Sequence, residues 1–326
     1  MKIPGPIASA LLAIGMLAAP PAGAQNSPAF PDKPIRMIVP VGAGGSTDIM
    51  LRQLAVLAEP LLGQPIVIIN RPGASGMMGV AGVARAPADG YTIGGVWSGP
   101  VSMAPHIEPS GYSFDDYVMV APVTEAPGVL CVAPNFPAND GRQLLEELKR
   151  NPGKYTYGTE GIGGFVHLSS ERIFSAVGIK AVAVPFSGAN QTVTAFLGGH
   201  IDIFGGGIST VLEFAKQGKA KCLLVTSAKR HPALPETQSL DDVGLSTSET
   251  LLWRAIIAPA GTPPQYLAKL EKVFGEAARM PAFRQFAQSR GESPWLVDRA
   301  TGQKYMGDEY RAMGSLVQRL GLTKDR

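Results

Sequence analysis

A glycine-rich turn between a predicted strand and a predicted helix is the feature that most restricts the fold of this chain. Residues 35–40 are mostly apolar, which predicts a buried strand, and residues 50–61 carry apolar side chains three and four apart, which predicts a helix. Residues 42–48 between them read GAGGSTD. Glycines let the backbone approach a ligand closely, and the first turn of a helix presents unpaired N–H groups at the positive end of the helix dipole. The turn therefore predicts an anion-binding site.

The same turn matches neither common nucleotide-binding motif. No Lys follows the glycines, as a P-loop requires, and Thr47 stands where a dinucleotide-binding turn has its third glycine. We therefore expect neither a nucleotide nor any other cofactor. Ser46, Thr47 or Asp48 is expected to cap the helix, and hydroxyl groups there can also donate to a carboxylate. For Asp48, capping is favoured over holding a bridging water, although the two roles are compatible.

The first 24 residues have the features of a secretory signal peptide. Lys2 gives a weak positive start, residues 7–19 are apolar, and Ala24 lies at a small-residue cleavage site before Gln25. A retained membrane anchor is the alternative, but the apolar run is short for a membrane span and two prolines end it. No second apolar stretch of spanning length follows. We therefore expect a periplasmic protein that is not embedded in the membrane.

The charge of the chain argues against a nucleic-acid partner. The formal net charge is +3, or +2 once Lys2 leaves with the signal peptide, and the basic residues are scattered rather than clustered. The 4 histidines lie far apart and lack the spacing of metal ligands, so no metal site is expected.

The two cysteines leave one question open. Cys131 and Cys222 both lie in apolar, strand-like runs. They can pair only if those strands are neighbours with matching Cβ directions. Buried free thiols are the favoured interpretation, and a disulfide is the alternative.

Short predicted strands alternate with predicted helices along most of the chain, which is typical of parallel α/β layers. Two such units are expected, joined by crossings at residues 118–123 and 251–253. They give a discontinuous first domain, residues 25–125 plus 252–326, and a second domain, residues 126–251. Ligands of open parallel sheets bind outside the carboxyl ends of the strands, so a ligand cleft is expected between the two domains.

The second domain repeats the strand-turn-helix pattern of the first. Residues 157–164, YGTEGIGG, lie between a strand and a helix, and residues 185–190, PFSGAN, follow the next strand. Opposed helix N-termini suit an anion held between them. Trp97 and Phe186 are aromatic residues beside such turns, and packing in the core is favoured over contact with a ligand.

Eight short segments carry a family resemblance, in this order along the chain: residues 31–36 (PDKPIR), 44–48 (GGSTD), 70–73 (NRPG), 89–92 (DGYT), 157–159 (YGT), 198–202 (GGHID), 225–230 (VTSAKR) and 258–263 (APAGTP). Together they resemble the extracytoplasmic solute receptors of tripartite tricarboxylate transporters, the Bug-type binding proteins. The resemblance covers essentially all of the chain after the predicted signal peptide.

This resemblance implies a two-domain periplasmic binding protein of type II, which closes like a Venus flytrap around a small ligand, usually a carboxylate. It implies a receptor, not an enzyme, that captures a small organic acid and delivers it to the membrane permease subunits of a tripartite tricarboxylate-type transporter; we expect it to be a monomer. Bound water is expected to mediate some contacts. The ligand-binding residues that it implies are Gly45, Ser46, Thr47, Asp48, Ser98, Thr159, Glu160, Gly161, Gly163, Ser187 and Asp202. For Asp202, a structural turn contact is an equal alternative.

Glu160 departs from the family pattern, in which this loop position is commonly small or hydroxylated. A carboxylate there would repel a second negative group on the ligand, because two like charges about 4 Å apart repel by roughly 4 kcal/mol at an effective dielectric of about 20. A side chain that points to solvent is the favoured alternative. Ala43 and Ile69 also depart from the pattern, and neither should prevent binding, because backbone amides form the site.

Two other classes of function stay open. A ligand-sensing subunit for a membrane signalling partner shares the same binding chemistry. A secreted hydrolase is disfavoured, because the chain has no G-x-S-x-G turn: residues 73–77, GASGM, lack its last glycine.

Overall fold

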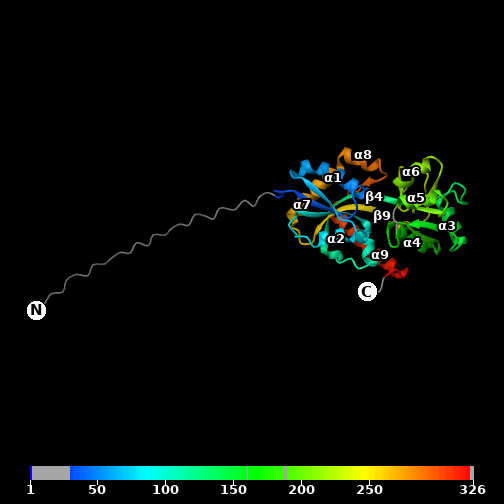
Figure 1. Cartoon of the computed structure of the whole chain (residues 1–326), viewed down its shortest axis with the longest axis horizontal. Helices are drawn as coiled ribbons and strands as arrows, with labels where there is room; N and C mark the ends of the chain where they lie inside the picture. The colour runs from blue at the N-terminus through cyan, green and yellow to red at the C-terminus, as the bar shows by residue number, and fades with distance from the viewer. Residues whose placement is uncertain (2–29, 160, 187–188, 324–326) are drawn as a thin grey trace.

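The computed structural model describes Met1 and residues 30–159, 161–186 and 189–323. The predicted signal peptide, Glu160 and Ser187 lie outside these residues. Two lobes are visible in Figure 1, one holding α1, α2 and α7–α9 and the other, in green, holding α3–α6, with β4 and β9 between them. The elements of the first lobe come from both ends of the chain.

The first lobe is built on a sheet with the strand order β2-β1-β3-β9-β4. Its strands are β1 (Ile35–Val39), β2 (Ile66–Asn70), β3 (Thr92–Trp97), β9 (Leu251–Pro259) and β4 (Tyr117–Val132), with the short β10 (Ser293–Pro294) on β4. β1 pairs in parallel with β2 and β3, whereas β9 is antiparallel to both of its neighbours.

Five helices cover this sheet: α1 (Ser46–Leu62), α2 (Met77–Ala84), α7 (Pro264–Arg279), α8 (Pro281–Gln288) and α9 (Arg299–Arg319). The predicted helix over 50–61 is confirmed as part of α1, which buries Met50, Leu51 and Leu54. α1 ends where Gly63 adopts a left-handed conformation with φ 76°, which only glycine adopts without steric cost.

The second lobe has the strand order β4-β7-β5-β6, with β8 also paired to β4. Its strands are β5 (Thr156–Thr159), β6 (Val182–Pro185), β7 (Ile203–Gly207) and β8 (Lys221–Val225). Its helices are α3 (Gly141–Arg150), α4 (Phe165–Val177), α5 (Ala189–Leu197) and α6 (Ile208–Lys216). Short helical turns complete the described chain: η1 (Ala74–Gly76), η2 (Gly99–Met103), η3 (Ala104–His106), η4 (Phe114–Asp116) and η5 (Ser246–Ser248).

A single 16-residue strand, β4, belongs to both lobes. It pairs with β9 as far as Pro127 and with β7 and β8 from Gly128 onward. The sequence predicted separate strands near 118–123 and 129, because periodicity does not reveal that a strand continues while its partners change. Thr226 lies where β4 passes from one sheet to the other. Its hydroxyl accepts from Gly128 N at 2.8 Å and donates to Thr250 O at 2.6 Å. The domain boundaries themselves stay a prediction.

A hydrophobic cluster also connects the lobes away from the strands. Met103 of η2 packs with Phe165 and Leu168 of α4 and with Met313 and Leu316 of α9. The last helix of the first lobe therefore packs against a helix of the second.

Cys131 and Cys222 form a disulfide, so the expectation of free thiols was wrong. The two residues are direct partners in the antiparallel pairing of β4 with β8. Their Cβ atoms point to the same side of the sheet, and the condition set by the sequence analysis for pairing is met.

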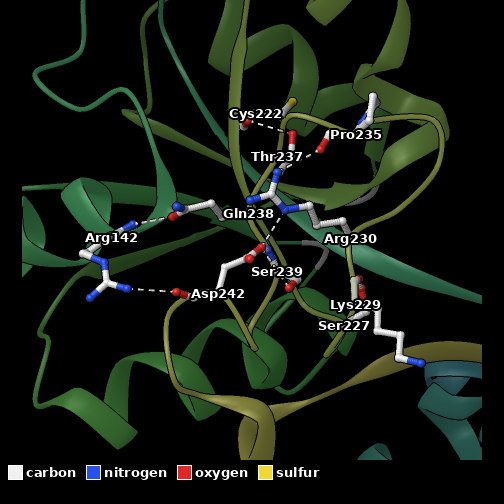
Figure 2. A network of polar contacts seen from close by, with 10 residues as sticks. All are labelled: Arg142, Cys222, Ser227, Lys229, Arg230, Pro235, Thr237, Gln238, Ser239 and Asp242. Atoms are coloured by element: carbon white, nitrogen blue, oxygen red, sulfur yellow. Dashed lines mark hydrogen bonds and ion pairs between the residues drawn. The ribbon is translucent and has the colours of Figure 1, made fainter.

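A network of polar contacts fixes the conformation of the segment that follows β8 (Figure 2). Asp242 accepts from Arg230 Nε at 2.7 Å and from Ser239 N at 2.8 Å, and its backbone oxygen accepts from Arg142 at 2.9 Å. Thr237 donates to Cys222 O at 2.9 Å. These bonds hold residues 227–242 against the disulfide-bearing strand.

Within the described part of the chain, no helix has the length and apolar character needed to cross a membrane.

Candidate functional site

The first glycine-rich turn is held in shape by the buried carboxylate of Asp48. Its oxygens accept from Gly44 N at 2.8 Å, Arg52 Nε at 2.9 Å and Asn70 Nδ2 at 2.7 Å. Burial alone would raise the pKa of this carboxyl, but the hydrogen bonds from Arg52, Asn70 and Gly44 outweigh it and lower the pKa. Asp48 therefore remains ionised and fixes the turn.

The helix cap differs from the prediction. Gly45 is the N-cap residue of α1, and no side chain caps it, so the expected cap by Ser46, Thr47 or Asp48 was wrong. Ser46 and Thr47 instead lie in the first helical turn, where their hydroxyls accept from another partner.

That partner is Arg254 of β9, a residue that the sequence analysis missed. Its buried guanidinium donates from Nε to Thr47 Oγ1 at 3.1 Å and from Nη2 to Ser46 Oγ at 3.2 Å. Arg254 also forms a buried ion pair with Glu292, which accepts from Thr124 Oγ1 at 2.8 Å. Because arginine only donates, both hydroxyls accept from it and keep their own protons to donate. The one charged residue in the apolar run 251–259 was the available signal.

In the second lobe, the turn before α4 is ordered by its own glycines and by a histidine. Thr159 is buried at the end of β5 and accepts from Gly161 N at 3.3 Å, and Gly164 is the N-cap of α4. Gly163 N donates to His167 Nδ1 at 3.0 Å. Burial lowers the pKa of His167, which favours the neutral ring that can accept this hydrogen bond. Gly161 and Gly163 have φ of 107° and 79°, so this backbone path requires glycine.

A cavity of about 250 Å³ lies between the two lobes. Trp97 and Gly99 line it from the first lobe, and Gly161 and Gly163 line it from the second. Gly207, the N-cap of α6, lines it as well, so the helices α4 and α6 both begin at this cavity. The unpaired amides of their first turns present partial positive charge to the cavity.

The two lobes touch across the cavity through a glycine. A Cβ at Gly163 would lie 1.9 Å from Cδ1 of Ile107, so an added side chain would have to displace the end of the Ile107 side chain or move the lobes apart. The expectation that Trp97 is packed in the core was wrong, because its side chain is partly exposed in the cavity lining. Phe186, in contrast, packs beside a core cluster of the second lobe, as expected.

The predicted residues Ser98, Thr159 and Asp202 do not reach the cavity lining. Ser98 is completely buried, and its Oγ has no hydrogen-bond partner within the described residues. Asp202 accepts from Thr156 N and Thr156 Oγ1, both at 2.8 Å. Thr156 begins β5 and Thr159 ends it, so Asp202 lies at the opposite end of the strand from Gly161 and makes the structural contact that was its alternative. The residues Gly45 to Asp48 do not line this cavity either.

Among the described residues, no group of three or more His, Cys, Asp or Glu side chains is arranged to hold a metal ion.

Two α/β lobes joined by crossing strands, with helix N-termini at a cavity between them, define a solute-binding protein of the periplasmic type. Residues 50–322 match the model of the tripartite tricarboxylate transporter family receptors, and the chain belongs to this family. The resemblance seen in the sequence is thereby confirmed.

The comparisons with individual proteins agree. The chain is 34% identical over 302 residues to a UPF0065 protein of Bordetella pertussis, and the match covers 92% of this chain and 94% of that one. It is similar to the Rhodopseudomonas palustris protein Rpa4515 with adipate, with a TM-score of 0.76 and 25% identity over 90% of this chain and 98% of that one. It is also similar to MatC (Rpa3494) of Rhodopseudomonas palustris with bound malate, with a TM-score of 0.74 and 25% identity over 88% of this chain and 100% of that one.

Proposed function

We propose that this protein is a periplasmic receptor that captures a small organic acid between its two lobes and delivers it to the membrane subunits of a tripartite tricarboxylate-type transporter. The observation that carries the proposal is the joint start of α4 and α6 at the cavity between the lobes. Adipate and malate, bound by two structures to which this chain is similar, are both carboxylates.

The binding chemistry comes from amides and hydroxyls. The first-turn N–H groups of α4 donate to the carboxylate from Phe165 and Val166, which line the cavity. Ser46 does not line the cavity in this structure, but it is exposed at the start of α1, and Arg254 leaves its hydroxyl proton free to donate to a ligand when the lobes close. Hydrogen bonds to a charged group contribute roughly 1.5–3 kcal/mol each, so three or four of them support micromolar affinity after the cost of ordering.

Closure of the lobes completes the site. A ligand that contacts both lobes binds the closed form better and shifts the population toward it. The crossing of β4 between the sheets, near Pro127 and Gly128, is the point about which the lobes turn. The permease subunits then recognise the surface of the closed form. The receptor acts as a periplasmic monomer and catalyses no reaction.

A ligand-sensing role for a membrane signalling partner uses the same binding steps. Neighbouring genes for permease subunits support transport, and a neighbouring gene for a sensor kinase supports signalling. An enzyme is tested by incubating the purified protein with candidate acids and measuring turnover.

The proposal is tested by calorimetry of the purified mature protein against a panel of organic acids and neutral sugars. One-to-one binding of an acid with micromolar affinity is expected. The proposal is contradicted if no acid binds and a neutral sugar does.

A further inference from the structure

Polar and apolar groups contribute about equally to the wall of the interlobe cavity. Its apolar part includes side chains from both lobes and from β9: Met77, Trp97, Ile107, Ile162, Phe165 and Leu252. Among the described residues that line the cavity, Glu108 is the one charged residue, and none is Lys or Arg. The described lining therefore combines apolar side chains with polar groups, and it includes one acidic residue and no basic one.

The indole of Trp97 is built into this wall. A Cβ at Gly76 would lie 2.5 Å from Cη2 of the ring, and a Cβ at Gly99 would lie 2.5 Å from its Nε1. Glycines at these two positions make room for opposite ends of the indole, which stays partly exposed to the cavity. The wall thus presents a fixed aromatic surface that suits an apolar or aromatic group.

We propose that the cavity takes the apolar or aromatic body of a monocarboxylic acid and discriminates against acids that carry a second carboxylate. The inference rests on the proposed function, which supplies the first carboxylate's partners at the helix starts. Binding would remove a second carboxylate from water and give it no cation to pair with, and this desolvation is unfavourable. The charge of Glu108 adds repulsion. Contact with Trp97 and Phe165 favours a ligand that buries hydrocarbon instead.

The volume agrees with a ligand of modest size. About 250 Å³ lies just below the roughly 300–1,000 Å³ of small-molecule pockets in general. A six-carbon chain or a single aromatic ring with one carboxylate fits this space.

The test uses matched pairs of acids that differ only in the second carboxylate: hexanoate with adipate, and benzoate with terephthalate. Calorimetry at neutral pH and low salt is expected to show at least tenfold tighter binding of the monoacid in at least one pair. Glu108→Gln is expected to reduce the ratio of monoacid affinity to diacid affinity at least threefold. Glu146→Gln, a change of the same kind on the exposed face of α3, is expected to leave the ratio unchanged.

Trp97→Ala is expected to weaken the monoacid at least tenfold, and Trp97→Phe, which keeps an aromatic ring, is expected to retain most of the affinity. If Trp97→Ala does not fold, the test rests on how Glu108→Gln changes the ratio of monoacid to diacid affinity. Equal or tighter binding of the diacids overturns this inference and leaves the proposed function standing. Binding of neither acid in any pair, with none found in the wider panel of acids, overturns both.

Discussion

Arg254 and Thr47 are 207 residues apart in the chain and are joined by a hydrogen bond of 3.1 Å from Nε to Oγ1. The same guanidinium reaches Ser46 and pairs with buried Glu292. The start of α1 is therefore oriented by a side chain of strand β9.

The first prediction separates the structural and binding roles of Arg254. Arg254→Met leaves the Glu292 carboxylate buried without a partner, so the free energy of unfolding is expected to fall by about 3–5 kcal/mol. The double variant Arg254→Met/Glu292→Leu is expected to regain most of this stability, because both charges are gone. Ligand affinity is expected to fall at least tenfold in both variants, since Ser46 and Thr47 lose their orienting donor. Urea unfolding and calorimetry measure the two effects, and a stable double variant with full affinity would contradict the positioning role.

The second prediction concerns Asp48. Its pKa is lowered in the folded protein, so it stabilises the fold above its unfolded pKa of about 3.9, and this stabilisation disappears as the pH falls through the folded value. Asp48→Asn is expected to lower the melting temperature at pH 7 and to have little effect near pH 2. Melting curves of both proteins across this range check the prediction. If the melting temperatures of the two proteins differ by the same amount at both pH values, the charge of Asp48 does not contribute to stability.

The third prediction concerns His167. Burial lowers its pKa, so the unfolded chain binds the proton more readily than the folded protein does. Stability is therefore expected to fall as the pH drops below the unfolded pKa of about 6.5. His167→Asn keeps an acceptor for Gly163 N without titrating in this range, and it is expected to flatten the dependence of the melting temperature on pH between 7 and about 5. An unchanged slope in the variant contradicts the assignment.

How far the sequence predicts this molecule depends on the range of the interaction. The α/β class, the helix after the first turn and the glycine-rich turns follow from local patterns, since periodicity and glycine act over a few residues. Gly161 and Gly163 line the interlobe cavity, and their role in binding the ligand stays a prediction. For Asp48, the sequence predicted a polar role, but the partners Asn70 and Arg52 depend on how β2 lies beside the turn.

Features that depend on pairing over long distances were not predictable in this way. The register that places Cys131 opposite Cys222 arises only when β4 and β8 become neighbours. Arg254 reaches the first turn only because β9 lies beside β3. Trp97 was assigned to the core because an aromatic residue at a strand end gives no sign of a cavity beside it, and here the cavity is made by the other lobe.

The fourth prediction concerns the network in Figure 2. The hydrogen bond from the Arg230 side chain, with that from Ser239 N, lowers the pKa of Asp242 to about 2. Its stabilising effect is therefore present above pH 4 and is lost as the pH falls toward 2. Asp242→Asn is expected to lower the melting temperature at pH 7 but not at pH 2. Asp308→Asn, which removes an exposed carboxylate from the i,i+3 and i,i+4 pairs of α9, serves as a control and is expected to have a smaller effect at pH 7.

The last prediction concerns closure and uses the contact between Gly163 and Ile107. Ile107 Cδ1 lies 1.9 Å from where a Cβ at Gly163 would be, and the φ of 79° at Gly163 also disfavours a side chain. Gly163→Ala is therefore expected to hold the lobes apart and to weaken ligand binding at least tenfold. Small-angle scattering is expected to show a smaller radius of gyration for the wild type with saturating ligand, and a smaller change for the variant at saturation. Gly178→Ala serves as the control, because Gly178 also has a positive φ, 71°, but an added Cβ there meets no atom within 4 Å. Its backbone strain is matched and it has no contact across the lobes, so an equal loss of binding in both variants would mean that strain, rather than closure, is responsible.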